Sequence, residues 1–170
     1  KQIKEINLQL AEMSNKFDNN LNNCTDFYVF SKEELLGLEE VNGFLEKRKL
    51  NDTDTYKITL KYPDYLPVME YCKVRNTRKV IATAFNSRCV KENLPLCVET
   101  FKLRLKKAQL LGYEQYSDYV LEKRMAKTTS NVMNFLIDLK NKMKSKSAQD
   151  LVDLQKISSE MGQSENIELY

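Results

Sequence analysis

The chain has 170 residues, and none of them is histidine or tryptophan. Histidine is the commonest general base near neutral pH and the commonest metal ligand in proteins. Its absence excludes every triad that needs an imidazole, and also the HExxH motif, in which two histidines on one helix face hold zinc. No glycine-rich loop precedes a predicted helix to bind phosphate. The sequence therefore predicts no catalytic, cofactor-binding or metal-binding residue.

Glycine and proline are also scarce, at four and three residues, as expected of a mostly helical chain. The four cysteines are Cys24, Cys72, Cys89 and Cys97, and none forms the close pairs typical of a zinc knuckle. Cys89 and Cys97 lie on predicted apolar stripes, where a free cysteine behaves as a small hydrophobe. We interpret the cysteines as core thiols, with a metal or disulfide role as the alternative.

No apolar run approaches the roughly 20 residues that span a bilayer, and the amino terminus shows no signal-peptide pattern. The apolar content of 42% and charged content of 30% are typical of soluble globular proteins. The basic residues Lys102, Arg104, Lys106 and Lys107 are balanced by acids, and the net charge is +3. We therefore expect neither a membrane nor a nucleic-acid partner. Because the chain starts without methionine and stops after a polar run, we expect a fragment.

Two long helices are predicted from apolar residues at steps of three and four. Residues 1–23 carry a heptad-like seam for one partner helix, with a dimerising coiled coil as the alternative; its members are Ile3, Ile6, Leu10, Met13, Phe17 and Leu21. A helix from Asn93 to Gly112 carries two stripes, so we expect neighbours on both sides. The first stripe is Leu94, Cys97, Val98, Phe101, Leu105 and Ala108, and the second is Leu96, Leu103 and Leu110. Three tyrosines, Tyr113, Tyr116 and Tyr119, suit a wall between core and water.

One small two-stranded β ribbon is predicted between these helices. Residues Thr55–Tyr62 alternate between apolar and polar side chains, which is typical of a half-buried strand, and Phe27–Phe30 is the candidate partner. Ser31 and Glu34 form a capping box, which predicts a helix that breaks at Gly37 and resumes towards Arg48.

Further helices are predicted over the rest of the chain. One begins at Tyr65, is capped by Asp64 and faces Leu66, Met69 and Cys72 inward; another begins at Asn76 or Thr77 and buries Val80, Ile81, Ala84, Phe85 and Cys89. A short helix covers residues 115–121. Thr128 to Ser130 are expected to cap a helix whose apolar stripe is Val132, Phe135, Leu136, Leu139 and Met143. Ser145 and Ser147 are expected to end it. A last helix is predicted over 148–161, with Gly162 as its stop. The fold class is mainly α, a multi-helix bundle of about seven or eight helices with one ribbon, in a single domain over 1–170.

Four segments in the same order resemble one known family. They are FYVFSKEEL (27–35), YKITLKYPDYLPVMEYCKV (56–74), AFNSRCVKENLPL (84–96) and LLGYEQYSDYVLEKRMAK (110–127). Together they resemble the amino-terminal half of the thimet oligopeptidase and neurolysin family of zinc metallopeptidases. The resemblance extends over nearly the whole chain.

The resemblance implies a large, mainly helical enzyme whose two halves flank a deep channel. Zinc would sit on an HExxH helix in the catalytic half and activate water to hydrolyse short peptides. This chain would form a channel wall or scaffold and be inactive alone, because none of the zinc ligands has a counterpart here. The implied partners are short peptides and the missing catalytic half, in the cytoplasm or in mitochondria. The alternative is a free-standing helical protein-interaction domain with no catalytic role.

Overall fold

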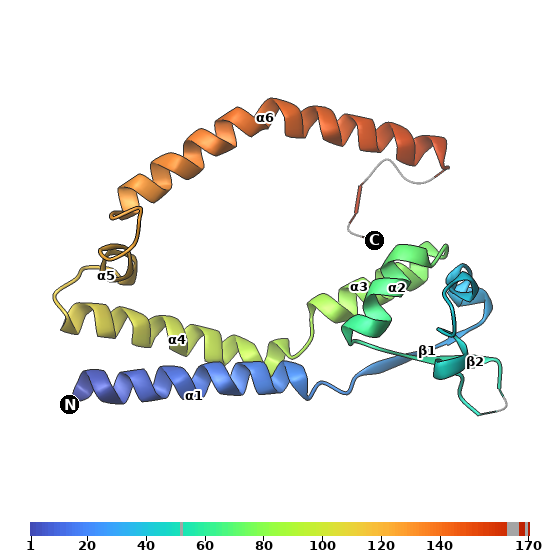
Figure 1. Cartoon of the computed structure of the whole chain (residues 1–170), viewed down its shortest axis with the longest axis horizontal. Helices are drawn as coiled ribbons and strands as arrows, with labels where there is room; N and C mark the ends of the chain where they lie inside the picture. Colours follow the sequence, from blue (N-terminus) through green and yellow to red (C-terminus); the bar gives the residue numbers. More distant parts are fainter. Residues whose placement is uncertain (52, 163–166, 169) are drawn as a thin grey trace. The chain divides into compact units, whose positions relative to one another are not determined.

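The computed structural model describes residues 1–51, 53–162, 167–168 and 170. Along these residues there are six α-helices, fewer than the seven or eight expected: α1 (Gln2–Asn22), α2 (Tyr62–Tyr71), α3 (Arg75–Asn86), α4 (Val90–Leu110), α5 (Tyr116–Leu121) and α6 (Thr129–Glu160) (Figure 1). Three short 3₁₀ helices and two strands complete the described elements. The prediction of a mainly helical chain with one small ribbon is confirmed.

The chain divides into two compact units. Unit 1 comprises Lys1–Ser14 and Pro95–Glu168, and unit 2 comprises Asn15–Leu94 and Leu169–Tyr170. Helices α1 and α4 each contribute residues to both units.

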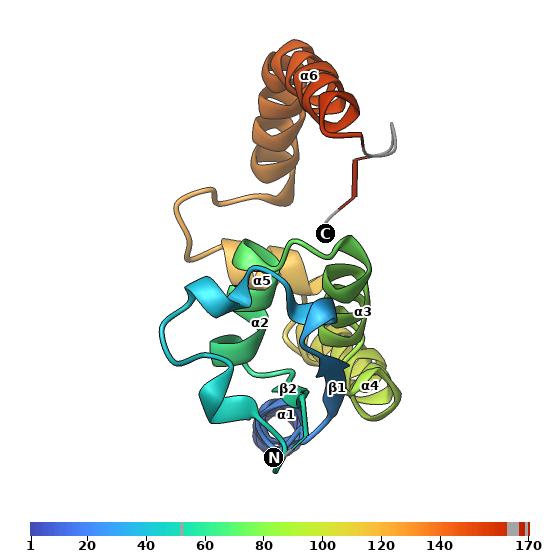
Figure 2. The same ribbon diagram turned by 90° about the vertical axis from the view of Figure 1, so that its right-hand side faces the viewer.

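The main apolar core lies in unit 2, where β1 (Phe27–Ser31) pairs antiparallel with β2 (Thr55–Thr59). The register sets Phe30 opposite Tyr56, and both side chains are buried with Ile58 and Leu60. Helices α2 and α3 lie beside each other over this ribbon (Figure 2). Two strands alone are marginal in water, so the helices that cover the ribbon are needed to stabilise it. The expected strand continues to Tyr62, but the structure ends it at Thr59 because α2 begins at Tyr62, whose side chain is exposed.

The segment after β1 differs from the predicted helix. The capping box is present: the backbone N–H of Ser31 donates to Glu34 Oε2 at 2.8 Å, and the N–H of Glu34 donates to Ser31 Oγ at 3.4 Å. Instead of an α-helix broken at Gly37, three 3₁₀ helices follow, η1 (Glu33–Leu35), η2 (Leu38–Glu40) and η3 (Glu46–Arg48).

A three-residue period explains this outcome. Leu35, Leu38 and Phe44 are buried, and Val41, at the same spacing, is partly buried against the same core. Successive tight turns hold this spacing, since the N–H of Val41 donates to the carbonyl of Leu38 at 3.2 Å and the N–H of Phe44 to that of Val41 at 3.0 Å, and such turns advance about three residues each. Gly37 lets this segment pack closely against the end of α2. Its φ is +99°, and an added Cβ would lie 2.3 Å from the carbonyl oxygen of Tyr71.

Asp64 does not cap α2 as expected. Its carboxylate accepts instead from Arg48 Nε at 2.7 Å and from the backbone N–H of Thr59 at 2.7 Å, and only 7% of the residue is exposed. Arg48 also donates to the carbonyls of Phe44 and Pro63, at 2.8 and 3.1 Å. The ion pair therefore joins η3, the end of β2 and the start of α2.

The buried faces of α2 and α3 agree in part with the predicted ones. In α2 the side chain of Val68 is fully buried, while Leu66, expected to face inward, is 52% exposed. In α3, Ile81 and Ala84 are buried as predicted. The unpredicted Thr77 is also buried, because its hydroxyl donates to the carbonyl of Glu34 at 2.7 Å.

In unit 1, residues 2–14 of α1 lie antiparallel to the part of α4 from Pro95 onward (Figure 1). The predicted seam is correct, since Ile6 is buried and Ile3, Leu10 and Met13 are partly buried. The Thr100 hydroxyl lies 3.7 Å from Met13 Sδ. The expectation that α4 is covered on both sides is wrong for the described residues. Leu103 and Ala108 are buried, but several apolar side chains stay exposed, namely Val98, Phe101, Leu105 and Leu110.

Helix α6 is one continuous helix of 32 residues, where two helices were expected. Its start is as predicted, because Thr128 Oγ1 accepts from the N–H of Asn131 at 3.1 Å. Serine is a weak helix former but does not break a helix, so Ser145 and Ser147 remain helical. The ion pair between Lys146 and Asp150, at 2.6 Å, spans this region of the helix. None of the described helices is long and apolar enough to cross a bilayer.

The Arg48–Asp64 pair makes a direct stability prediction. Replacing Asp64 by Asn keeps the shape but leaves the largely buried guanidinium without its counter-charge, so we expect a loss of about 2–4 kcal/mol in the free energy of unfolding. The matched control is Asp138→Asn, which breaks an ion pair with Lys142 whose side chains are 58% and 72% exposed, and which should cost less than about 0.5 kcal/mol. Urea unfolding followed by circular dichroism measures both. Equal losses in the two variants would contradict the central role of Asp64.

Candidate functional site

Zinc is held by Cys, His, Asp and Glu side chains gathered in one place. In the part of the chain that the structure describes, no three such residues come together in a way that could hold a metal ion. The sequence itself supplies no histidine. The described residues thus do not fit a zinc ion, and no catalytic step is derived through one.

The four cysteines are free thiols. Cys72 is buried in the core of unit 2 as predicted, where its thiol contacts the carbonyl of Glu34 at 3.5 Å. Burial raises the pKa of the Cys72 thiol above its ordinary value, so this group stays protonated near neutral pH. Cys24, Cys89 and Cys97 are only partly buried, which departs from the expectation of four core thiols.

The three tyrosines after α4 gather into a cluster in unit 1. The rings of Tyr113 and Tyr119 meet edge to face with centroids 5.4 Å apart, and Tyr116 lies 5.9 Å from Tyr119. Two cations of α4 lie over these rings, Arg104 over Tyr116 at 5.5 Å and Lys107 over Tyr119 at 5.2 Å. Part of the basic charge of α4 is thus used inside the chain to hold α4 and α5 together.

The Tyr113 hydroxyl donates a hydrogen bond to the Glu122 carboxylate. This bond stabilises the protonated phenol and is the main reason why the pKa of Tyr113 is raised above its ordinary value. The interaction fastens the loop after Gly112 to the end of α5. We therefore assign it a structural role.

Unit 2 contains a cleft of about 290 Å³. It lies among η2, η3 and β2, and its buried apolar lining is Leu38, Phe44 and Tyr56. Four exposed charged residues of both signs also line it, namely Lys32, Glu39, Glu46 and Lys49. An apolar base with mixed charges can accept a side chain or a small amphipathic molecule, but it offers no imidazole, thiol or metal cluster for chemistry.

One carboxylate of this cleft is held ionised. The pKa of Glu39 is lowered, first by a hydrogen bond from its own backbone N–H and also by the N–H of Gly37, which donates to Glu39 Oε2 at 2.7 Å. Lys73 adds a favourable charge nearby. Glu39 is therefore a fixed negative group rather than a proton donor at neutral pH.

The comparisons with known proteins agree with the resemblance drawn from the four segments. The family model described as Peptidase family M3 matches residues 68–170, which is more than half of the chain. The chain belongs to peptidase family M3.

Curated relatives carry related names. A thimet-like oligopeptidase of Dictyostelium discoideum is 38% identical over 135 residues, covering 78% of this chain and 20% of that protein. Saccharolysin of Saccharomyces cerevisiae is 37% identical over 163 residues, covering 93% of this chain and 23% of that protein. Oligopeptidase A of Salmonella typhimurium is 29% identical over 163 residues, covering 88% of this chain and 24% of that protein. The chain thus spans about a fifth to a quarter of the length of these relatives.

The hydrogen bond between Tyr113 and Glu122 predicts a measurable pH effect. The pKa of Tyr113 is higher in the folded than in the unfolded chain, so its stabilising contribution is complete below about pH 10 and is lost as the pH rises through the folded pKa. In Glu122→Gln, we expect the pKa of Tyr113 to fall towards its ordinary value, whereas Glu114→Gln in the same loop should leave it unchanged. An NMR titration of ring-labelled tyrosines measures this. An unchanged Tyr113 titration in Glu122→Gln would refute the assignment.

Proposed function

We propose that this chain is the amino-terminal channel-wall and scaffold segment of a zinc-dependent oligopeptidase that hydrolyses short peptides. Membership of peptidase family M3 and the names of the relatives support a peptidase. The chain matches only about a fifth to a quarter of each of these relatives, which supports the interpretation that it is one part of a larger enzyme. In this proposal residues 1–170 form a single helical domain of the amino-terminal half.

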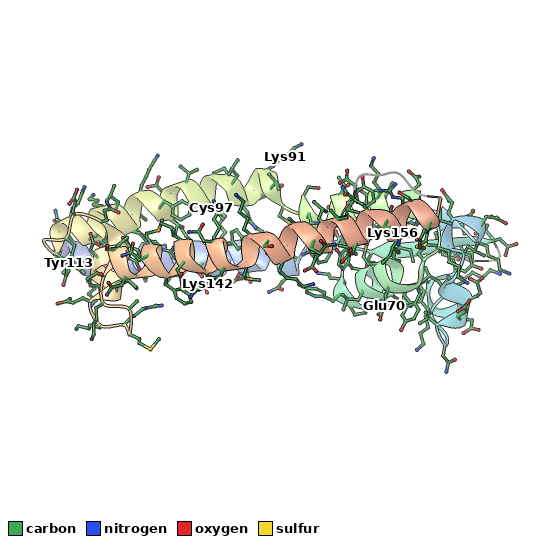
Figure 3. The ribbon with its side chains drawn as sticks, turned by 90° about the horizontal axis from the view of Figure 1, so that it is seen from above. Glu70, Lys91, Cys97, Tyr113, Lys142 and Lys156 are labelled. Atoms are coloured by element: carbon green, nitrogen blue, oxygen red, sulfur yellow. The ribbon has the colours of Figure 1, made fainter. Side chains whose placement is uncertain are left out.

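The observation that carries the proposal is the apolar surface of unit 1. Every described residue of α6 is exposed or only partly buried, and its exposed apolar side chains include Phe135, Leu136, Leu139, Met143, Leu151, Leu154 and Ile157. Lys142 and Lys156, labelled in Figure 3, lie on the same helix. Helix α4 adds Val98 and Phe101 to the exposed apolar residues. Amphipathic helices bury their apolar faces, so we propose that the missing half of the parent covers these helices.

The division of chemistry follows from the residue types. The described residues do not bring metal ligands together, so in this proposal the zinc belongs to the catalytic half and the 170-residue chain is inactive alone. Its partners are that half and the short peptides that enter between the two, and we propose neither a nucleic-acid nor a membrane partner. Four free thiols support a reducing compartment, with the cytoplasm first and the mitochondrion second.

The alternative is a free-standing helical interaction domain that binds a partner helix through α6. The same exposed residues favour it, because an uncovered apolar face is what a helix-binding protein presents. The two proposals differ in what covers α6: the rest of the same polypeptide, or a separate protein.

An activity assay tests the enzyme part of the proposal. With an internally quenched short peptide as substrate, the 170-residue chain should show no hydrolysis above buffer, with or without added zinc. The parent protein should hydrolyse the peptide, lose this activity with a metal chelator and regain it with zinc. Hydrolysis by the 170-residue chain would show that a site within it has been missed, and a parent without zinc-dependent activity would overturn the oligopeptidase proposal.

A matched pair of double variants tests the scaffold part. Phe135→Gln with Leu139→Gln removes apolar surface from side chains that are 65% and 41% exposed, so the 170-residue chain should lose less than about 1 kcal/mol. In the parent, if α6 is covered, the same change should lower the unfolding temperature by roughly 5 °C.

The control for that pair is Lys140→Gln with Lys144→Gln on the same helix, which should leave both proteins within about 1 °C of the wild type. If the apolar variant affects the parent no more than the control does, α6 remains uncovered in the parent. That result would favour the interaction-domain alternative.

A further inference from the structure

Two cysteines that are far apart in the sequence meet in unit 2. Cys24 follows the end of α1, and Cys89 lies in the short connection between α3 and α4. The Cys89 thiol donates a hydrogen bond to the carbonyl oxygen of Asn20, in the last turn of α1, with a distance of 3.2 Å. Cys24 is one of the groups that raise the pKa of the Cys89 thiol, so the two side chains lie near each other. The backbone N–H of Cys24 donates to the carbonyl of Leu21 at 3.3 Å, so Cys24 lies at the same helix end that accepts the Cys89 thiol, and neither cysteine is oxidised.

Contacts that do not involve sulfur hold this arrangement. Asn20 Nδ2 donates to Asn93 Oδ1 at 2.7 Å, and Asn93 Nδ2 donates to the carbonyl of Phe17 at 3.4 Å. Asn93 is 5% exposed, so these bonds join the end of α1 to the start of α4 away from water. Lys61 Nζ, 2.5 Å from the carbonyl oxygen of Asn22, fixes the same helix end from the side of β2. The thiols are thus pre-positioned by the fold and do not need to find each other by diffusion.

The backbone at Cys89 is unusual. Its φ is +53°, in the left-handed region that residues with a Cβ seldom adopt. Residues in this region persist where the surrounding structure holds them, and they gather at functional sites. Asparagine or glycine would fit such a turn with less strain, yet a cysteine with its thiol against α1 stands here.

We propose that Cys24 and Cys89 are a modification site, a dithiol that closes reversibly into an intramolecular disulfide. Closing it would link the end of α1 covalently to the connection between α3 and α4. Because both cysteines lie at the end of α1, we expect their side chains to reach the roughly 2.05 Å sulfur–sulfur separation of a disulfide bond. Cys72 is not a competing partner, because its thiol is buried against the carbonyls of Glu34 and Val74. Cys97 belongs to unit 1.

The oxidant that we specify is a small disulfide, and glutathione disulfide is the example. One cysteine thiolate attacks a sulfur of glutathione disulfide, forms a mixed disulfide and releases one glutathione thiolate. The second cysteine loses its proton, attacks the protein sulfur of that mixed disulfide and releases the second glutathione. The two protein thiols give up two electrons and two protons, and one glutathione disulfide becomes two glutathione molecules.

The surroundings set the pH dependence of this reaction. The pKa of Cys89 is raised, chiefly by burial, then by the neighbouring Cys24, and further by the carboxylates of Glu92 and Asp26. The reactive thiolate of Cys89 is therefore scarce near neutral pH, and the dithiol stays reduced until oxidant or pH increases. Between pH 7.5 and 8.5 we expect the rate of disulfide closure to rise up to about tenfold, following the thiolate fraction.

Peptide mapping of the whole 170-residue chain tests the proposal. After treatment with glutathione disulfide, blocking of free thiols and digestion with trypsin, mass spectrometry without reductant should detect residues 17–32 joined to residues 89–91. The link closes a loop of about 65 residues, so the unfolding temperature should rise by roughly 5–15 °C and return to its starting value with dithiothreitol. In Cys24→Ser both the linked peptide and the temperature rise should vanish, whereas Cys97→Ser should behave as the wild type.

Three results would overturn the proposal: glutathione attached to both cysteines without a link, a link to Cys72 or Cys97 instead, or only disulfides between two chains. The mapping of the wild type decides between these results and the expected one even if a serine variant fails to fold. The outcome is independent of the proposed peptidase function, because it is measured without substrate.

Discussion

The carboxylate of Asp64 connects three segments of unit 2 through one buried, hydrogen-bonded charge. It pairs with Arg48 at the end of the 3₁₀ region, accepts from Thr59 at the end of β2 and belongs itself to the first turn of α2. A mostly buried charge is stable only when it is paired and hydrogen-bonded, so these partners must remain in place. The ion pair constrains the core of unit 2, because Phe44, Leu60 and Val68, which lie near its three attachment points, are buried in that core.

Local periodicity was enough to predict much of the fold. The seam of α1 around Ile6, the alternation of Tyr56 and Ile58, and the Thr128 cap each arise within one element, so the sequence displays them. The 3₁₀ region was misread because apolar residues three apart also occur in α-helices, and only the core against which they pack selects the tighter helix. The position of Asp64 before a helix predicts a cap, but its partner Arg48 lies in another element, which the sequence does not show.

The sequence predicted no site residue, and the features that the structure adds come from tertiary contacts. The cleft near Phe44 and Tyr56 combines three elements, and the bond from the Cys89 thiol to the carbonyl of Asn20 joins segments far apart in the chain. Neither leaves a local motif. The covering predicted for α4 on both sides failed for a different reason: an apolar stripe shows that a helix face is to be buried, but it does not show which polypeptide buries it.

The exposed apolar helices of unit 1 motivate the proposal that this chain shapes a peptidase, and among the described residues no metal ligands gather. The most direct measurement is amide hydrogen exchange along α6, compared between the 170-residue chain and the parent protein. A covered helix opens less often, so the account predicts exchange at least tenfold slower in the parent, on the order of one further kcal/mol of protection. Equal exchange rates in the two proteins would contradict it.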